Sequence, residues 1–424
     1  MYAQRKILWL ICAAAAFVAA AATLPYAMAR SITVSGSLQA AIDAAEAGDT
    51  LILSPGTYSG PLVITKPLSI LGGGETEIIG TSSGSVIQVK APDITLKGLM
   101  VTGSGLSLET QDSGIFLHPE AVRAVVEDNE VANNLIGIYV SGAKDARVSG
   151  NRITGRQDLR MNERGNGIQI WNAPGAIIEG NDIRYGRDGI FVTTSKRNIF
   201  KNNRMRDLRF AIHYMYTNRS EVSGNRSARN HIGYAIMSSS DLVVTDNVSE
   251  QDRDRGLLFN YANRILAKGN IVRGGTEKCI FIYNSNNNEF EENLLADCDI
   301  GVHFTAGSEK NTLTRNAFVN NRNQVKYVGT RWLEWSKGGV GNYWSDQVAM
   351  DLDRDGIADS IYRPNDLTDR IIWQYPSTRL LMNSPAVQIL KYAQGNFPAL
   401  HPGGVVDGAP LMEMPRKLAA RSKS

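Results

Sequence analysis

The sequence has few cysteines, little net charge and no long apolar run beyond its first residues, and each scarcity excludes a class of protein. Three cysteines in 424 residues are too few for a disulfide scaffold. Because 45 Lys and Arg nearly balance 42 Asp and Glu, the chain lacks the basic field that tracks nucleic acid, and no nucleic-acid partner is expected. With 43% hydrophobic residues it is expected to be globular.

The first 29 residues have the organisation of an export signal. Arg5 and Lys6 form a positively charged start, residues 7–22 are apolar, and residues 27–29 (Ala-Met-Ala) are typical of a cleavage site. An uncleaved membrane anchor is the alternative, but this run is rich in alanine and is followed by the cleavage site. We therefore expect residues 1–29 to be a Sec-type signal peptide and the mature protein to be periplasmic.

The cysteine usage is compatible with export but does not depend on it. Cys12 would leave with the signal peptide, so only Cys279 and Cys298 remain. These two either form a disulfide or stay as separate buried thiols, and the sequence leaves both possibilities open.

An asparagine recurs along the chain in steps of 22 or 23 residues, with one step of 30. A second landmark, a small residue followed by an aliphatic one, recurs with the same period, and apolar residues alternate within each unit as in short strands. A leucine-rich repeat is excluded because its consensus is absent. The period predicts an all-β fold, a right-handed parallel β-helix of the pectin-lyase-like type with about 22 residues per coil. The asparagines are Asn129, Asn151, Asn181, Asn203, Asn225, Asn247, Asn270, Asn293 and Asn316.

These asparagines are expected to occupy left-handed turn positions and to stack their amides into a ladder from coil to coil. The one long step falls between Asn151 and Asn181, where charged residues near 156–164 must leave the coil as a loop. Loops on one face of a repeat array often border its binding surface.

The repeat pattern divides the mature chain into three parts. The β-helix is predicted for residues 30–330, and residues 331–372 form a Trp-rich segment with an acidic loop. Residues 373–424 form a C-terminal extension with a helix that begins near Pro385, and its last dozen residues are expected to be mobile or docked on a partner.

One pattern on the predicted strands indicates a soft-metal site. Side chains alternate in direction along a strand, so His213 and Met215 should share one face, and the small-aliphatic landmark places Met237 one coil above His213. Imidazole and thioether ligands suit Cu(I), and adjacent strands lie about 4.8 Å apart. The alternative is that the two methionines only pack against their neighbours.

A column of carboxylates at Asp254, Glu277 and Asp299 precedes three successive strands. A glycosidase or lyase needs two carboxyl groups at such separations. The alternative, which we favour, is a solvated turn column neutralised by Arg253, Arg255 and Lys278.

The acidic loop in the Trp-rich segment matches the spacing of a calcium-binding loop, with carboxylates at positions 1, 3, 5 and 9, a Gly at 6 and a backbone carbonyl at 7. Tyr362 stands at position 12 in place of the usual Glu, so that ligand is missing or comes from Asp366 or Asp369. A plain acidic turn is the alternative to structural calcium. The candidate ligands are Asp351, Asp353, Asp355, Ile357 and Asp359.

Several segments together give a resemblance to a known family. Residues 41–45 (AIDAA), 55–58 (PGTY), 66–70 (KPLSI) and 341–346 (GNYWSD), with the 22-residue coils, resemble NosD, and the last segment is the most specific. The resemblance implies a periplasmic copper-processing factor, not an enzyme, for the maturation of nitrous oxide reductase in denitrification. It also implies a complex with an ABC transporter permease and ATPase at the inner membrane, a membrane-anchored copper chaperone as the copper donor, and the reductase as client.

A polysaccharide-active enzyme (lyase, hydrolase or epimerase) or a carbohydrate-binding module is the competing prediction. It rests on the carboxylate column, with Trp171 and Tyr283 as sugar platforms.

Overall fold

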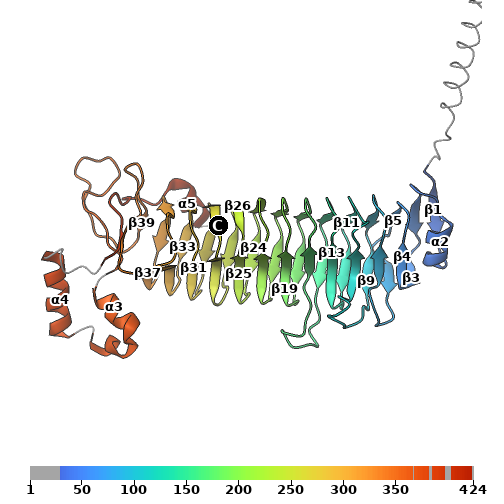
Figure 1. The fold of residues 1–424 in the computed structure, drawn as a ribbon, viewed down its shortest axis with the longest axis horizontal. Coiled ribbons are helices and arrows are strands. Elements are labelled where there is room, and N and C mark those ends of the chain that lie inside the picture. Colours follow the sequence, from blue (N-terminus) through green and yellow to red (C-terminus); the bar gives the residue numbers. More distant parts are fainter. Residues whose placement is uncertain (1–28, 366, 382–383, 397–402, 423–424) are drawn as a thin grey trace, which may run out of the picture.

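The computed structural model describes residues 29–424 except 366, 382–383, 397–402 and 423–424. The predicted signal peptide, apart from its last residue, and Cys12 lie outside the described residues. The rest is an elongated coil of parallel strands with a group of helices and loops at its C-terminal end (Figure 1). The predicted parallel β-helix is confirmed.

Three long sheets run along the solenoid, and each complete coil contributes one strand to each sheet. Sheet A has 13 parallel strands. They are β1 (Ser31–Val34), β2 (Thr50–Leu53), β5 (Ser69–Leu71), β8 (Thr95–Lys97), β11 (Val125–Glu127), β14 (Arg147–Ser149), β17 (Ile177–Glu179), β20 (Ile199–Lys201), β23 (Ser220–Ser223), β26 (Ser240–Thr245), β29 (Asn263–Lys268), β32 (Glu289–Glu291) and β35 (Thr312–Thr314).

Sheet B also has 13 strands. They are β3 (Gly56–Ser59), β6 (Thr76–Ile79), β9 (Met100–Thr102), β12 (Glu130–Ala132), β15 (Arg152–Thr154), β18 (Asp182–Arg184), β21 (Arg204–Arg206), β24 (Arg226–Ala228), β27 (Val248–Glu250), β30 (Ile271–Arg273), β33 (Leu294–Ala296), β36 (Ala317–Val319) and β39 (Tyr343–Trp344). Because β39 pairs with β36, sheet B continues beyond residue 330.

Sheet C has 12 strands and carries most of the residues singled out in the sequence. They are β4 (Leu62–Ile64), β7 (Ile87–Val89), β10 (Ser113–Leu117), β13 (Ile136–Ser141), β16 (Ile168–Trp171), β19 (Asp188–Thr193), β22 (Phe210–Met215), β25 (Ile232–Met237), β28 (Arg255–Asn260), β31 (Lys278–Tyr283), β34 (Ile300–Thr305) and β37 (Asn323–Val328).

Period-2 alternation builds the core between the three sheets. In β22, Ile212 and Tyr214 are buried while His213 and Met215 are partly exposed, and other strands repeat this pattern. The charged insertion leaves the coil between β15 and β16 as a loop that projects beside sheet C (Figure 1). The sequence pattern therefore decides which side chains of each strand face outward.

The predicted amide ladder is confirmed and extends one coil further than the sequence pattern showed. Asn203, for example, donates from its backbone N and its Nδ2 to Oδ1 of Asn225, at 3.0 and 2.9 Å. The last amide is Asn342, whose two N–H groups donate to Oδ2 of the buried Asp407 at 2.7 and 3.2 Å. A carboxylate from the C-terminal extension thus ends the ladder.

The expectation that the ladder asparagines themselves are left-handed is wrong. The residue immediately before each of them has the positive φ, which frees the asparagine to point inward. These residues are Asp128, Gly150, Gly180, Asn202, Gly224, Asp246, Gly269, Glu292 and Arg315.

The ends of the solenoid are closed differently. Helix α2 (Leu38–Ala44), capped by Ser37 and burying Leu38 and Ile42, covers the N-terminal end. At the other end the buried Trp335 and Trp344 stack on Phe318, with ring centroids 6.2 and 4.1 Å away.

Beyond this point the chain forms β38 (Trp332–Glu334), α3 (Leu367–Gln374), the 3₁₀ helix η1 (Pro376–Leu381), α4 (Pro385–Asn396), β40 (Gly404–Val406) and α5 (Arg416–Ser422). β38 pairs with β40. Helix α5 lies back along the solenoid (Figure 1), where Leu418 joins an apolar cluster on the outer face of sheet B. The tail is therefore docked on its own chain.

The two remaining cysteines form a disulfide. Cys279 lies in β31 and Cys298 just before β34, with Cα atoms 5.8 Å apart, so the bond joins adjacent coils. This settles the choice that the sequence left open.

Candidate metal centre

The three soft-metal candidates lie on the outer face of sheet C, but not in the predicted register. His213 and Met215 share the outward face of β22, as expected. Met237 pairs with Met215, however, and His213 pairs with Ala235. The landmark misled because the residue equivalent to Ile212 is Tyr234, not Ile236. A tyrosine fits the buried position because its hydroxyl donates to the carbonyls of Asn225 and Val248, at 2.8 and 2.9 Å.

The corrected register brings the two methionines together. Met215 and Met237 stand side by side on neighbouring strands, about 4.8 Å apart in the backbone, and His213 precedes Met215 by two residues on the same face. The three side chains therefore remain neighbours on one surface.

A buried carboxylate that the sequence analysis missed fixes the histidine ring. Asp188, the first residue of β19, is 1% exposed, and its Oδ2 accepts a hydrogen bond from His213 Nδ1 at 2.9 Å. Arg209 donates to both oxygens of Asp188 at 2.8 and 2.6 Å. Burial raises the pKa of the Asp188 carboxyl, but the hydrogen bonds from His213 and Arg209 outweigh burial and hold this pKa below its ordinary value.

Aromatic rings enclose the histidine from two sides. The ring centroids of Phe191 and Phe210 lie 5.0 and 4.8 Å from that of His213, and the Arg209 guanidinium lies 4.5 Å from the Phe210 ring centre. The His213 side chain is only 12% exposed. Rigid walls and a charged anchor therefore hold one imidazole in a single orientation.

This arrangement has the chemistry of a metal ligand with outer-shell support. When Nδ1 donates to a carboxylate, the other ring nitrogen, Nε2, keeps its lone pair for a ligand bond, and such partners orient metal-binding histidines. Met215 and Met237 add soft sulfur next to it. A signal for Asp188 did exist, because a carboxylate at the first outward position of a strand can reach the next coil.

The carboxylate column is neutralised within the described structure. Asp254 pairs with Arg255 at 2.9 Å and lies 3.9 Å from Lys278, and Glu277 contacts Lys278 directly. Asp299 lies 3.9 Å from Arg322. The favoured interpretation, a charged turn column, describes this arrangement.

The proposed sugar platforms do not come together. Trp171 and Tyr283 are both exposed, but β16 and β31 are separated by four strands of sheet C. At about 4.8 Å per strand, the two residues are about 24 Å apart.

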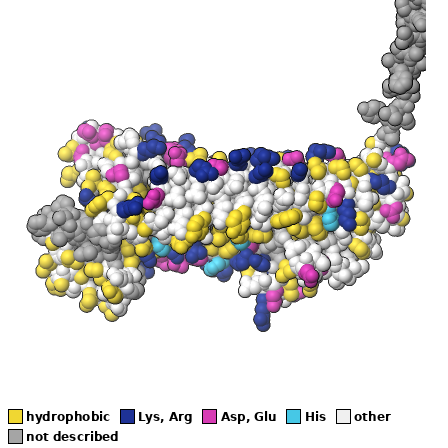
Figure 2. Space-filling model, in the orientation of Figure 1, with side chains coloured by type: hydrophobic (Ala, Val, Ile, Leu, Met, Phe, Trp, Pro, Cys, Tyr) yellow, Lys and Arg dark blue, Asp and Glu magenta, His cyan; other side chains and the backbone are white. Residues whose placement is uncertain are grey.

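Two further histidines, His118 and His303, lie on the outer side of sheet C. Figure 2 shows histidine side chains next to Lys and Arg side chains along the lower edge of the solenoid. His118 stacks on Phe116, with ring centroids 4.1 Å apart. His303 stacks on Phe281 at 4.7 Å, and its buried Nδ1 has no hydrogen-bond partner among the described residues. Burial and the charges of Lys326, Lys278 and Arg255 lower the pKa of His303 to about 4.

The acidic loop gathers three of its predicted ligands. Oxygens of Asp351, Asp353 and Asp355 lie within 4.8 Å of one another. Backbone N–H groups of the same loop donate to Asp351, Asp355 and Asp359. Tyr362 is not a ligand here, because its hydroxyl donates to Asp346 and its ring stacks on Trp344. Asp366 lies outside the described residues.

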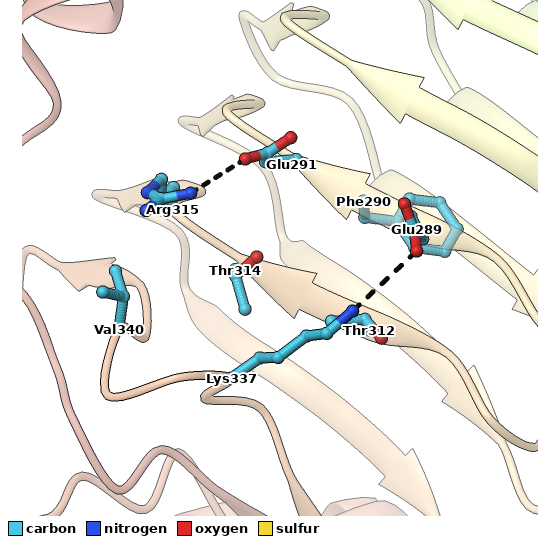
Figure 3. Close-up of a pocket in the computed structure, with 8 residues that line it drawn as sticks. All are labelled: Glu289, Phe290, Glu291, Thr312, Thr314, Arg315, Lys337 and Val340. Carbon is cyan, nitrogen blue, oxygen red and sulfur yellow. Dashed lines mark hydrogen bonds and ion pairs between the residues drawn. The ribbon is translucent and has the colours of Figure 1, made fainter.

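A hollow of about 230 Å³ near the end of sheet A (Figure 3) has no comparable chemistry. Its charges are paired, Glu291 with Arg315 at 3.0 Å and Glu289 with Lys337 at 3.9 Å. We do not treat it as a site.

Comparison with known proteins decides the family. The chain is 38% identical, over 86% of both chains, to a protein of Stutzerimonas stutzeri named "Probable ABC transporter binding protein NosD". The chain belongs to the NosD family. A NosD protein of Pseudomonas aeruginosa with the same printed name is 40% identical over 86% of this chain and 88% of its own. The family described as "Periplasmic copper-binding protein (NosD)" matches residues 149–349, which include the His213 site.

Solved structures agree on the NosD solenoid. The family 28 exopolygalacturonase of Yersinia enterocolitica superposes with a TM-score of 0.53 at 12% identity, covering 71% of this chain and 77% of the enzyme. At this identity the likeness shows a shared fold alone. None of the helices in the described part of the chain is both long and apolar enough to cross a membrane.

Proposed function

We propose that this chain is an exported accessory protein that binds Cu(I) transiently at His213, Met215 and Met237 and passes it on during copper-site assembly in nitrous oxide reductase. The observation that carries the proposal is the imidazole held by Asp188 beside a register pair of methionines. The name of the family, a periplasmic copper-binding protein, supports the choice of metal.

Transfer requires a site that captures Cu(I) and still releases it. Two thioethers and one imidazole on a rigid sheet are soft ligands without the strong grip of a thiolate cage. The only cysteines among the described residues, Cys279 and Cys298, are joined to each other and offer no thiolate. In this proposal the protein is a carrier of copper and not an enzyme.

The partners in this proposal are an ABC transporter permease and ATPase, a membrane-anchored copper chaperone as donor, and the reductase as client. The printed names of the two NosD relatives support the transporter. The C-terminal helices offer a surface for it, because Leu380 of η1 and Ile389 of α4 are 90% and 68% exposed. Leu380→Asp with Ile389→Asp should abolish copurification with the permease, whereas Val243→Asp on sheet A should not.

The copper site is tested by titrating the purified mature protein with Cu(I) against a competing chelator. Replacing Met215 and Met237 by Ala should weaken binding at least tenfold, and His213→Asn should do the same. Met350→Ala and His118→Asn, which change an exposed methionine and another outward histidine, should leave the affinity unchanged. Unchanged affinity in the Met215 and Met237 variant would place the site elsewhere.

The physiological role is tested in a strain that lacks the protein. The client reductase should still be exported but should contain less than its full complement of copper, measured on the purified enzyme. The His213→Asn variant should fail to restore the copper content. A reductase with full copper in the deletion strain would contradict the proposal.

We further propose that the Asp351 loop binds structural Ca²⁺. Hard oxygen ligands at this spacing suit Ca²⁺, and the loop packs against the end of the solenoid through its bridge from Ile357 to Leu411. Adding Ca²⁺ after chelation should raise the thermal midpoint of the wild type and of the control Glu109→Gln, but not of Asp351→Asn with Asp353→Asn. Equal midpoints with and without Ca²⁺ would favour the plain acidic turn.

A further inference from the structure

Many charged side chains on the outside of the solenoid pair with an opposite charge one coil away. Each such pair screens its own charges and adds little to the field around the protein. These pairs include Arg123 with Asp93 at 2.7 Å, Arg147 with Glu179 at 3.3 Å and Arg264 with Asp241 at 2.7 Å.

The outer face of β18, β21 and β24 in sheet B differs from these pairs because arginines gather on it in register. Its six outward positions hold Arg184, Arg204, Arg206 and Arg226, here called the arginine patch, together with Asp182 and Ala228. Arg206 reaches Asp182 at 3.5 Å. Arg204 and Arg226 are exposed and form no ion pair with any residue that the structure describes.

The register places like charges directly opposite each other. Arg184 pairs with Arg206, and Arg204 pairs with Arg226, so two neighbouring register pairs are both Arg–Arg. Opposed like charges on adjacent strands are destabilising. Arg206 reaches Asp182 and Arg184 donates to Thr154 Oγ1 at 3.2 Å, whereas Arg204 and Arg226 have no such compensation in the described part of the chain. A ligand that neutralises Arg204 and Arg226 would remove their repulsion.

The chemistry of arginine and the residues around the patch indicate the chemical class of its ligand. The planar guanidinium binds carboxylates and phosphates through two parallel hydrogen bonds, and all four cations are Arg. The six outward positions hold no aromatic residue. Tyr185, which follows Arg184, has the Arg184 guanidinium 5.8 Å from its ring centre, so its ring already faces a cation. Uncompensated basic charge attracts an acidic partner over several ångströms.

Helix α5 stands beside the patch on the same face. Arg226 pairs in register with Val248, and Val248 belongs to the apolar cluster that Leu418 of α5 covers. A helix with its side chains is about 10 Å thick, so a flat membrane would meet α5 before it reached the arginines. A narrow protein segment can lie beside α5 without this obstruction.

We propose that the arginine patch binds an acidic segment of a partner protein, laid across β18, β21 and β24 next to α5. This docking is separate from the copper site, since it lies on sheet B while His213 lies on sheet C. Glutamate and aspartate side chains of the segment supply the carboxylates that Arg204 and Arg226 lack within the described solenoid.

A fluorescent peptide of ten glutamates provides the probe, with fluorescence anisotropy on the mature protein at low salt as the measurement. Arg204→Gln with Arg226→Gln should weaken binding by about tenfold, from two charge contacts of roughly threefold each. The control pair Arg123→Gln with Arg264→Gln removes the same charge from sites that have a carboxylate partner, and should change the affinity by less than twofold. Equal weakening in both pairs would overturn the proposal.

Two further measurements separate the alternatives. Arg204→Lys with Arg226→Lys keeps the charge and removes the planar fork, so it should fold normally and bind the peptide several-fold more weakly. The thermal midpoint of the Gln pair should be unchanged or higher, since a repulsion is removed. Tight binding to phosphatidylglycerol vesicles that depends on Arg204 and Arg226, with no binding of the peptide, would identify a membrane site and overturn the proposal.

Discussion

His213 and His303 occupy the same outward column of sheet C, four strands apart, and each follows a phenylalanine in register. The first outward position of the preceding strand differs. It is Asp188 before His213 and Lys278 before His303, and these two residues also share a column of the sheet. One imidazole is held by a carboxylate, and the other is kept neutral by burial and nearby cations. The role of a histidine on this solenoid is therefore decided by one residue on the neighbouring coil.

Removing the Asp188 carboxylate should cause the largest loss of stability at either histidine. Asp188→Ala leaves Arg209 and His213 without their buried partner, and loss of one member of such a pair costs about 3–5 kcal/mol. Urea unfolding measures the change. Asp207→Ala, which breaks a more exposed pair with Arg229, should cost less than about 1 kcal/mol. Similar losses in both variants would show that Asp188 is no special anchor.

The second prediction concerns the loss of stability at low pH that His303 causes. Because the pKa of His303 falls from 6.5 to about 4 on folding, the unfolded chain binds a proton at higher pH than the folded one does. The stability that this histidine contributes is present above pH 6.5 and is lost as the pH falls towards 4, by about 3 kcal/mol at most. The unfolding free energy should be measured across this pH range. Its fall between pH 6.5 and 4 should be smaller in His303→Phe than in the wild type and unchanged in His231→Asn.

Replacing the positive charge beside His303 by a negative one should make its surroundings resemble those of His213. Lys278→Asp gives His303 the carboxylate that His213 has, so the pKa of His303 should rise by one unit or more, which is about 1.4 kcal/mol. Titration of the ring protons by NMR measures it. Lys326→Gln removes one cation and adds no carboxylate, so its effect should be smaller. No rise in Lys278→Asp would mean that burial alone sets this pKa.

The smallest expected effect comes from the phenylalanine ring that stands beside each of the two histidines. Phe191→Leu and Phe281→Leu each remove a ring beside a histidine and should each cost about 0.5–1.5 kcal/mol in thermal or urea unfolding. Near-equal costs would show that the aromatic wall is a common scaffold. A loss confined to Phe191→Leu would mean that the wall belongs to the metal site.

The period of the asparagines was sufficient to predict the coils, because every coil repeats the same local rule. The rule failed at Tyr234, where a hydroxyl with two carbonyl acceptors replaces an aliphatic side chain, and this shifted Met237 away from His213. Asp188 stands at a position from which a carboxylate can reach the next coil, but its partners Arg209 and His213 follow 21 and 25 residues later, so no local motif marks it. Asp407 could not be found from spacing, since it lies 65 residues after Asn342 and outside the repeat.

The amide ladder has a direction. Each asparagine donates to the amide oxygen on the C-terminal side and accepts from the asparagine on the N-terminal side, so the C-terminal end of the ladder presents N–H groups that need an acceptor. Asp407 occupies that side with an acceptor that offers no amide in return. The Asp407 carboxylate therefore acts as a chain terminator. It accepts hydrogen bonds from the N–H groups of Asn342, which are then not available to pair with another solenoid.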